Sequence, residues 1–345
     1  MKTRAIILSL SFLLIGYIAA GQTFKTPLEY MDFISNEQQG ITKNMWKYTK
    51  AIAHSKNEKN VDAKRASVIK SLERAIMKIE KAKSFEGEEE YKNRVLETLR
   101  LNENLMKQDY EKIIDMKAVA EQSYDAMEAY MLARELANEK MAEAQDAYEA
   151  HFYAYAAKHN IEIIEGETDL GKKMKISNAV FKHYNDMYLV FFKVNINEIY
   201  LFDAIETGDV SAILQNANAL NQTAKEGLEL LEGIELYKND PSIVNATKNS
   251  FEFFIDETET SIPIIVDYLV LNDEVTNINA ILEKTPERKR TKEQVDGYNA
   301  KVKEINKAVK EYNKINAQLN KQRHVALNKL NTTNQKFLSK HIPNE

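Results

Sequence analysis

The chain has 345 residues and a formal net charge of −5, with 44% hydrophobic and 29% charged residues. It contains 10 Gly, 5 Pro and no Cys, which excludes disulfides, thiol nucleophiles and thiolate metal sites. The apolar residues are spread along the chain, which excludes general disorder. Long intervals without proline, rich in Ala, Glu, Lys and Leu, favour helices throughout, and we predict the all-α class.

Residues 1–21 have the three-part layout of a secretory signal peptide. A basic start is followed by an apolar run from Ala5 to Ile18 and then by small residues up to Gly21. We predict cleavage before Gln22 and an exported mature chain that is periplasmic, attached to the cell surface or secreted. The alternative is a retained membrane anchor, since the run nearly spans a bilayer. No later segment approaches that length, so no transmembrane segment is expected after cleavage.

The helix signals divide the mature chain into long segments. Thr26 and Pro27 form a good helix start, and Thr291 begins a capping box. Neither glycine nor proline occurs between Gly87 and Gly166, so this interval is expected to hold one very long helix or two nearly collinear ones. The predicted helices cover residues 27–54, 61–83, 88–159, 169–206, 209–236, 241–283 and 292–340.

Two of these helices carry a narrow apolar stripe whose members alternate three and four residues apart, as in coiled coils. One stripe runs over 124–155 and the other over 295–319. The second contains Val295, Tyr298, Val302, Ile305, Val309, Tyr312, Asn316 and Leu319. We expect the two stripes to cover each other in one elongated bundle. The alternative is a homodimer in which the stripe over 295–337 pairs with its copy.

When the chain is displaced by 152 residues along itself, the helix landmarks of its two halves coincide. We call this displacement the half-chain shift. It places Val68 on Leu220 and the loop at 85–87 on 237–239. One interpretation is an internal duplication, in which each half is a short hairpin that leads into a long third helix. The alternative is a chance match between helical hairpins of similar length. A duplication would give two tandem three-helix units, 22–165 and 166–345.

Positive charge is concentrated near the C terminus. Residues 284–345 carry 15 Lys or Arg and 6 Asp or Glu, a net charge of +9, whereas residues 22–283 have a net charge of −16. Such asymmetry can mark a polyanion-binding tail. We favour a basic helix that lies along the acidic body of its own chain, because charges beside a coiled-coil seam commonly direct pairing.

The sequence shows no catalytic or metal-binding constellation. No two histidines lie three or four residues apart, and no glutamate precedes a histidine by three, as di-iron bundles require. The glycines form no phosphate-binding loop, and the C-terminal lysines lack the interleaved aromatic residues that stack on nucleic-acid bases. We therefore assign no catalytic, cofactor-binding or metal residue, and expect neither an enzyme, a cofactor nor a nucleic-acid partner.

An aromatic stripe over residues 181–202 is the strongest candidate for a ligand surface. Side chains at helical spacing more often belong to a core, but a tyrosine hydroxyl can meet water while its ring packs. The alternative function is therefore a periplasmic helical bundle that binds a small ligand or a metal, with this face as the pocket wall. The stripe comprises Phe181, Tyr184, Tyr188, Phe191, Phe192, Ile199 and Phe202.

The segment TPLEYMDFISNEQQGITKNMW, residues 26–46, resembles a group of exported, helix-rich bacterial surface proteins without assigned activity. Many members are lipoproteins, but this chain lacks the cysteine that would carry the lipid. The resemblance implies a helix-rich surface protein and carries over no functional residue. Our hypothesis is an exported, non-enzymatic helical protein that acts through contacts with an envelope or extracellular protein.

Overall fold

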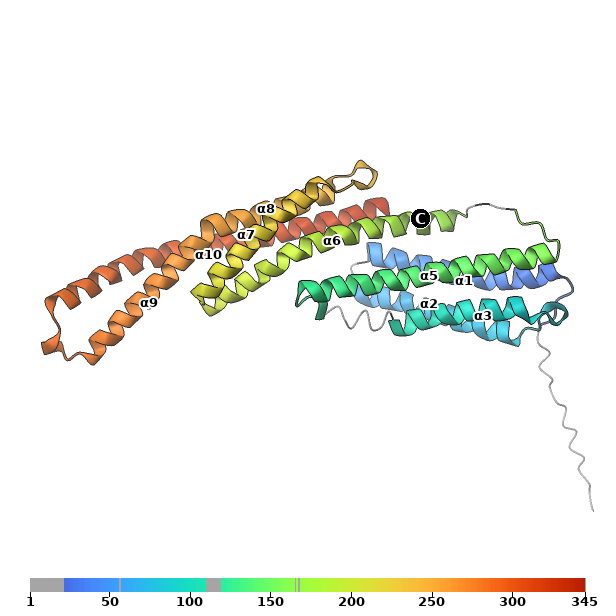
Figure 1. Cartoon of the computed structure of the whole chain (residues 1–345), viewed down its shortest axis with the longest axis horizontal. Helices are drawn as coiled ribbons and strands as arrows, with labels where there is room; N and C mark the ends of the chain where they lie inside the picture. Colours follow the sequence, from blue (N-terminus) through green and yellow to red (C-terminus); the bar gives the residue numbers. More distant parts are fainter. Residues whose placement is uncertain (1–21, 56, 110–118, 165, 167, 345) are drawn as a thin grey trace, which may run out of the picture.

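A computed structural model describes residues 22–55, 57–109, 119–164, 166 and 168–344, which places the predicted signal peptide outside the described part of the chain. The described residues form helices and turns and no strand, which confirms the all-α class. Figure 1 shows two helical bundles that lie end to end along the longest axis. Within the described ranges, no helix combines the length and apolar character needed to cross a membrane.

The first bundle contains α1 (Pro27–His54), α2 (Glu58–Lys81), α3 (Glu89–Asn104) and α5 (Tyr124–Lys158), with a 3-10 turn η1 (Phe85–Gly87) and a π-turn η2 (Leu105–Asp109). Helix α1 begins as predicted because the Thr26 hydroxyl accepts a hydrogen bond from the Glu29 backbone N–H at 3.1 Å. The amphipathic helices bury one common core, whose members include Tyr30, Ile34, Val68, Leu72, Ile79, Val95, Leu99 and Tyr155.

The second bundle contains α6 (Asp169–Thr207), α7 (Val210–Glu232), α8 (Ser242–Asp256), α9 (Ile262–Lys284) and α10 (Lys292–His341), with turns η3 (Tyr237–Asn239), η4 (Glu257–Ser261) and η5 (Glu287–Lys289). Helices α8 and α9 are continuous through η4, which is a π-turn. The turn accommodates Pro263, whose ring would clash with the carbonyl group four residues earlier in a regular helix. The predicted helix over 241–283 is therefore one helix with a local widening.

Side chains of the first bundle reach into the second where the two bundles meet. Trp46 and Ala53 of α1 belong to the buried core of the second bundle. Met127 and Met131 of α5 form a smaller buried cluster with Phe192 of α6. Helix α6 therefore contacts both bundles, as the long yellow-green helix of Figure 1 illustrates.

The prediction of one long helix, or two collinear ones, over 88–159 is wrong. Helices α3 and α5 lie side by side and run in opposite directions (Figure 1). Ser123 begins α5, since its hydroxyl accepts a hydrogen bond from the Ala126 backbone N–H at 3.2 Å. Residues 110–118 lie outside the described ranges. Folding back is favoured because it buries aromatic surface that a single rod would expose, and the Tyr91 and Tyr155 rings stack at 4.5 Å.

The two apolar stripes do not cover each other, so that expectation is also wrong. Helix α5, which carries the stripe over 124–155, packs against α3 and α6. Helix α10, which carries the stripe over 295–319, packs against α8 and α9, and its Tyr312 ring stacks on Tyr268 of α9 at 4.2 Å. Segments that follow one another along a chain are usually neighbours in space. Each stripe accordingly packs against a helix that is close to it in the chain.

The two halves share local features that go beyond general helicity. Glu86 in η1 and Lys238 in η3 both have a left-handed backbone, with φ of 49° and 47°. The half-chain shift also places the π-turn at 105–109 on the π-turn at 257–261. The third segment folds back in both halves, so each holds four helical stretches among the described residues rather than three. These matches support the predicted duplication, which stays a proposal about the origin of the chain.

A carboxylate beside the left-handed turn holds the end of the last helix in each half. The two sets are Glu88 with Lys158 and His159, and Asp240 with Lys340 and His341. The carboxylates obey the half-chain shift, but the second Lys-His pair lies further along the chain than this shift would place it. Between the π-turn and the Lys-His pair, the second half is therefore about thirty residues longer than the first.

The Asp240 contact is the more completely hydrogen-bonded of the two. Burial acts to raise the pKa of Asp240, but hydrogen bonds from Lys340, His341 and Ser242 outweigh it and hold that pKa well below its usual range. The ionised carboxylate thus ties the last turn of α10 to the loop that precedes α8.

Tyr155 provides a direct test of the correspondence between the two halves. Superposing the two Lys-His pairs places Tyr155 of α5 on Phe337 of α10. The Tyr155 hydroxyl is buried without a hydrogen-bond partner, and burial raises the pKa of this tyrosine to about 12. We expect Tyr155→Phe to leave the free energy of unfolding unchanged or to raise it by up to about 1 kcal/mol, because an unsatisfied polar group is removed. Urea denaturation followed by circular dichroism measures the change.

Tyr148→Phe is the matched control for this prediction. The Tyr148 hydroxyl hydrogen-bonds with Ser35, so its removal should lower the free energy of unfolding by about 1 kcal/mol. Equal losses in both variants would show that the Tyr155 hydroxyl is satisfied in solution.

Candidate functional site

The additional length of the second half extends α9 and α10 beyond the turn between α6 and α7 (Figure 1). We call residues 270–310 the distal hairpin. In this range only Leu271 and Leu282 are buried, whereas the apolar side chains of Val270, Ile281 and Val295 are exposed. Two helices alone cannot cover their apolar stripes fully, so the distal hairpin retains apolar surface in contact with solvent.

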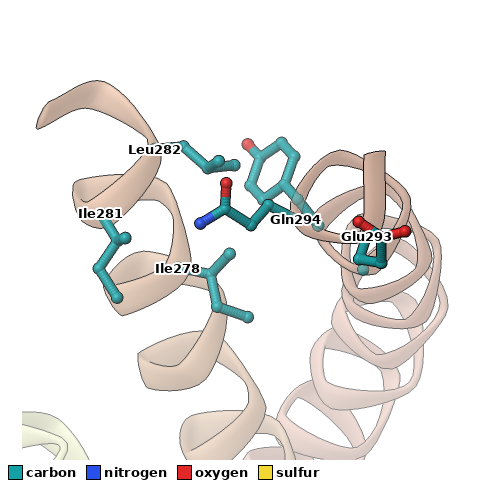
Figure 2. Close-up of a pocket in the computed structure, with 7 residues that line it drawn as sticks. Ile278, Ile281, Leu282, Glu293 and Gln294 are labelled. Atoms are coloured by element: carbon teal, nitrogen blue, oxygen red, sulfur yellow. The ribbon is translucent and has the colours of Figure 1, made fainter. Parts of the chain in front are cut away.

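A groove of about 300 Å³ lies between the two helices near the tip of the distal hairpin. Figure 2 shows that Ile278, Ile281 and Leu282 line it from α9, and that Glu293 and Gln294 belong to the facing helix. Gly297 and Tyr298 complete the lining. Apart from Gly297, its two neighbours in the chain and the adjacent backbone of its own helix, nothing lies within 4 Å of the position that a Cβ at Gly297 would take, so the missing side chain leaves room for an inserted apolar group.

Local hydrogen bonds fix the shape of the tip. The predicted capping box is confirmed, because the Thr291 hydroxyl accepts from the Gln294 backbone N–H at 3.2 Å and the Gln294 side chain accepts from the Thr291 backbone N–H at 2.9 Å. Arg290 Nε donates to the carbonyl groups of Leu282 and Thr285 at 3.1 and 2.9 Å. The groove is therefore held open by a preorganised turn rather than by a loose loop.

A second candidate feature is a buried ionic cluster in the middle of the second bundle, formed by Glu198 of α6, Glu257 of η4 and Arg323 of α10. Arg323 forms ion pairs with both carboxylates, and their side chains are 5% and 0% exposed. The Arg323 guanidinium also lies over the Phe202 ring, 4.8 Å from its centroid. One arginine serves two acids, so the cluster has one negative charge in excess when both acids are ionised.

The cluster controls the protonation of its acids. Burial raises the pKa of Glu198, against the opposing effect of Arg323. Burial also raises the pKa of Glu257 to about 7, with the charge of Glu198 adding to the effect and Arg323 opposing it. Near neutral pH Glu257 is therefore protonated in part of the molecules, and burial acts on Glu198 in the same direction. Such a group can hold a proton or lock three elements together, but it opens on no described cleft.

The pKa of Glu257 predicts that stability falls as the pH rises through neutrality. Its folded value of about 7 exceeds the ordinary value of 4.5, so its favourable contribution is complete below about 4.5 and is lost as the pH passes 7. A shift of this size corresponds to roughly 3 kcal/mol. We expect Glu257→Gln to flatten the decline, as measured by urea denaturation at pH values of about 5 and 8.

Glu252, an exposed carboxylate on α8, provides the control for the pH experiment. Glu252→Gln should leave the pH dependence of stability as it is in the natural chain. The assignment of the pH dependence to Glu257 is wrong if the natural chain and the Glu257→Gln variant lose the same stability between the two pH values.

The aromatic stripe over 181–202 does not form one pocket wall. Phe191 stacks on Phe251 of α8 at a centroid distance of 6.5 Å, whereas Tyr188 and Phe192 belong to the contact with α5. Phe202 lies under Arg323. The stripe divides because its members point to different sides of α6, and the structure uses these sides for separate helix contacts.

The cations of α10 only partly support the expectation that this basic helix pairs with its own acidic body. Arg323 and Lys340 bind acids of the body, and Lys301 binds Glu274 of α9 at 2.9 Å. The other lysines of α10 form no ion pair in the described part of the chain.

No group of three or more His, Asp or Glu residues in the described ranges is placed to hold a metal ion. No protein-family description matches the chain, and no curated protein or solved structure is significantly similar to it. The candidate sites therefore rest on the geometry of this chain alone.

Sequence reasoning missed the ionic cluster and named no residue of it as a site. Its members lie on three elements that are far apart in the chain, so no local spacing connects them. One signal was present, since Glu198 lies in the mostly apolar stretch from Tyr188 to Phe202, which Lys193, Asn195 and Asn197 also interrupt. A carboxylate on the buried side of a helix requires a partner, and that requirement points to a cation elsewhere in the chain.

Proposed function

We propose that this protein is exported and works without catalysis, as a surface or periplasmic helical protein that binds another protein through the distal hairpin. The observation that carries the proposal is the apolar groove between α9 and α10, on an arm that the first half lacks. A concave apolar site with a few fixed polar groups is typical of a binding surface. The groove suits an apolar side chain from a partner helix, because Gly297 leaves space between α9 and α10.

The packing near residue 22 supports export. The Gln22 carbonyl accepts a hydrogen bond from the Lys83 backbone N–H at 3.1 Å. Phe24 contacts Tyr30 and Phe33, with ring centroids 4.9 and 5.2 Å away. Gln22, the residue that follows the expected cleavage site, is thus itself held against the folded body. This placement, with the resemblance to exported surface proteins, makes the envelope or the cell exterior the proposed location.

We expect capture of a partner to depend on the groove. Mature protein with its N terminus at Gln22 would be immobilised and exposed to envelope extract, and the bound proteins quantified by mass spectrometry. Ile281→Glu places a charge on the groove wall, and Gly297→Leu fills the groove. Each should reduce the captured partner about tenfold or more, since losing one well-buried apolar contact costs roughly 1.4 kcal/mol or more.

Leu214→Glu on α7 is the matched control, because Leu214 is 53% exposed and Ile281 is 58% exposed. This control should capture the partner as well as the natural chain does. Light scattering distinguishes a second copy of this chain from a different protein, since a homodimer would dissociate in the Ile281→Glu variant. Capture that both groove variants retain in full would contradict the proposed binding surface.

A further inference from the structure

Five lysines form a straight row on one face of α10, and we call this row the lysine ladder. Its spacings of four, three, four and seven residues return to the same side of an α-helix. From first to last residue the ladder extends about 27 Å at 1.5 Å per residue. Its members, all exposed, are Lys303, Lys307, Lys310, Lys314 and Lys321.

The ladder faces away from the body of the protein. Tyr312 and Leu319 mark the face of α10 that packs inward, since Tyr312 stacks on Tyr268 and Leu319 is buried in the core. Lys310 and Lys314 lie two residues on either side of Tyr312, about half a helical turn away from that face. The acids of the body therefore cannot neutralise the ladder from the inner side.

The fold leaves these charges uncompensated. Among the described residues, none of the five lysines forms an ion pair, although Lys301 on the inner face pairs with Glu274 and Glu304. Lysines three or four residues apart on one helix repel each other and destabilise it. Glu304 and Glu311 lie on the same helix within four residues of ladder lysines, but among the described residues Glu304 pairs with Lys301 and Glu311 forms no ion pair. Five lysines thus face two acids, which leaves the ladder an excess of positive charge directed outside the chain.

We propose that the lysine ladder binds a linear polyanion, an extended polymer with anionic groups repeated along its length. A straight row of ammonium groups on a rigid helix matches such a polymer, because each lysine can meet a successive anionic group without bending either partner. Lysine acts as a point charge and does not require one acid geometry, so sulfate, carboxylate and phosphate polymers share the necessary chemistry. This binding surface is separate from the apolar groove.

The test compares the natural mature chain with a variant in which the five ladder lysines are changed to Gln. Fluorescence anisotropy would follow binding to labelled heparin, polygalacturonate and inorganic polyphosphate at several salt concentrations. Release of counterions makes affinity fall with salt in proportion to the number of charges in contact. We expect the variant to bind the preferred polymer about tenfold or more weakly at low salt, and its log–log salt slope to be smaller by about 3 to 4.

The control variant has the same change in charge on the first bundle. It replaces five exposed lysines, which form no ion pair with any residue that the structure describes, with Gln: Lys43, Lys70, Lys81, Lys83 and Lys140. This control should keep the affinity and salt slope of the natural chain to within about twofold. Ile281→Glu should also keep this affinity and salt slope, so the proposals for the ladder and for the distal groove can be refuted independently. Circular dichroism verifies that each variant is folded.

The preferred polymer identifies the anionic group that the ladder accepts. Equal weakening in the ladder and control variants would overturn the proposal, because it would show general attraction to positive charge. Binding to vesicles of anionic lipid with no binding to any of the three polymers would also overturn it, in favour of a membrane surface.

Discussion

Arg323→Met is expected to lower the free energy of unfolding by about 3–5 kcal/mol near neutral pH, the largest single effect that the structure predicts. Glu198 and Glu257 would stay buried without a positive partner, and their side chains are almost fully enclosed. Urea denaturation followed by circular dichroism measures the loss. It should become smaller at acidic pH, where both carboxyl groups can take up a proton.

The first half suggests how to replace the whole ionic cluster. The half-chain shift relates Glu198 and Glu257 to Trp46 and Leu105, and the two Lys-His pairs relate Arg323 to Met141, so the first half has apolar residues at all three positions. The triple variant Glu198→Met, Glu257→Leu, Arg323→Met should therefore recover the stability lost in Arg323→Met, or exceed that of the natural chain by about 1–4 kcal/mol. A triple variant as unstable as Arg323→Met alone would refute this correspondence.

Gly227→Ala is expected to lower the free energy of unfolding by about 1–3 kcal/mol, although alanine favours helices more than glycine does. A Cβ at Gly227 of α7 would lie 2.6 Å from the Phe251 ring, closer than such atoms approach, and 3.2 Å from the Val194 side chain, which is a tight contact. Phe251 is completely buried and cannot move aside freely. Thermal and urea denaturation of the single variant measure the effect.

A double variant tests the cause of this loss. The half-chain shift relates Gly227 and Phe251 to Ala75 and Leu99, which are both buried in the first bundle. Gly227→Ala with Phe251→Leu should thus cost less than the sum of the two single changes, by about 1 kcal/mol or more. Strict additivity would mean that the two side chains do not compete for the same space.

The sequence was most informative where local chemistry decides the structure. Thr26 with Pro27, and Thr291 with Gln294, locate the starts of α1 and α10 because a capping group acts within one turn. The reversal before α5 was missed because Ser123 is its only cap and the region lacks glycine and proline. Helix α7 ends at Glu232, earlier than predicted, because Gly233 follows it and apolar residues continue into the turn.

Long-range pairing was less predictable. The stripe over 295–319 was recognised as a surface that needs a partner, but periodicity does not say which helix covers it. The groove of the distal hairpin could not be predicted either, since it depends on how Gly297 faces Ile278 across two helices. The ionic cluster requires the fold itself, because only the packed bundle brings Arg323 to Glu257.

The longer hairpin of the second half, formed by α9 and α10, shows how the length of this molecule can change during evolution. In two antiparallel helices, each residue added on the outgoing helix can be balanced by one on the returning helix. An insertion of about thirty residues, divided equally, would move the tip outward by about 22 Å while the base keeps its alignment. Lys340 and His341 contact Asp240 at 2.7 Å although the hairpin between them is longer than its counterpart in the first half. The length of the hairpin is thus independent of the packing at its base. Paired insertions or deletions can therefore change the length without disturbing that packing.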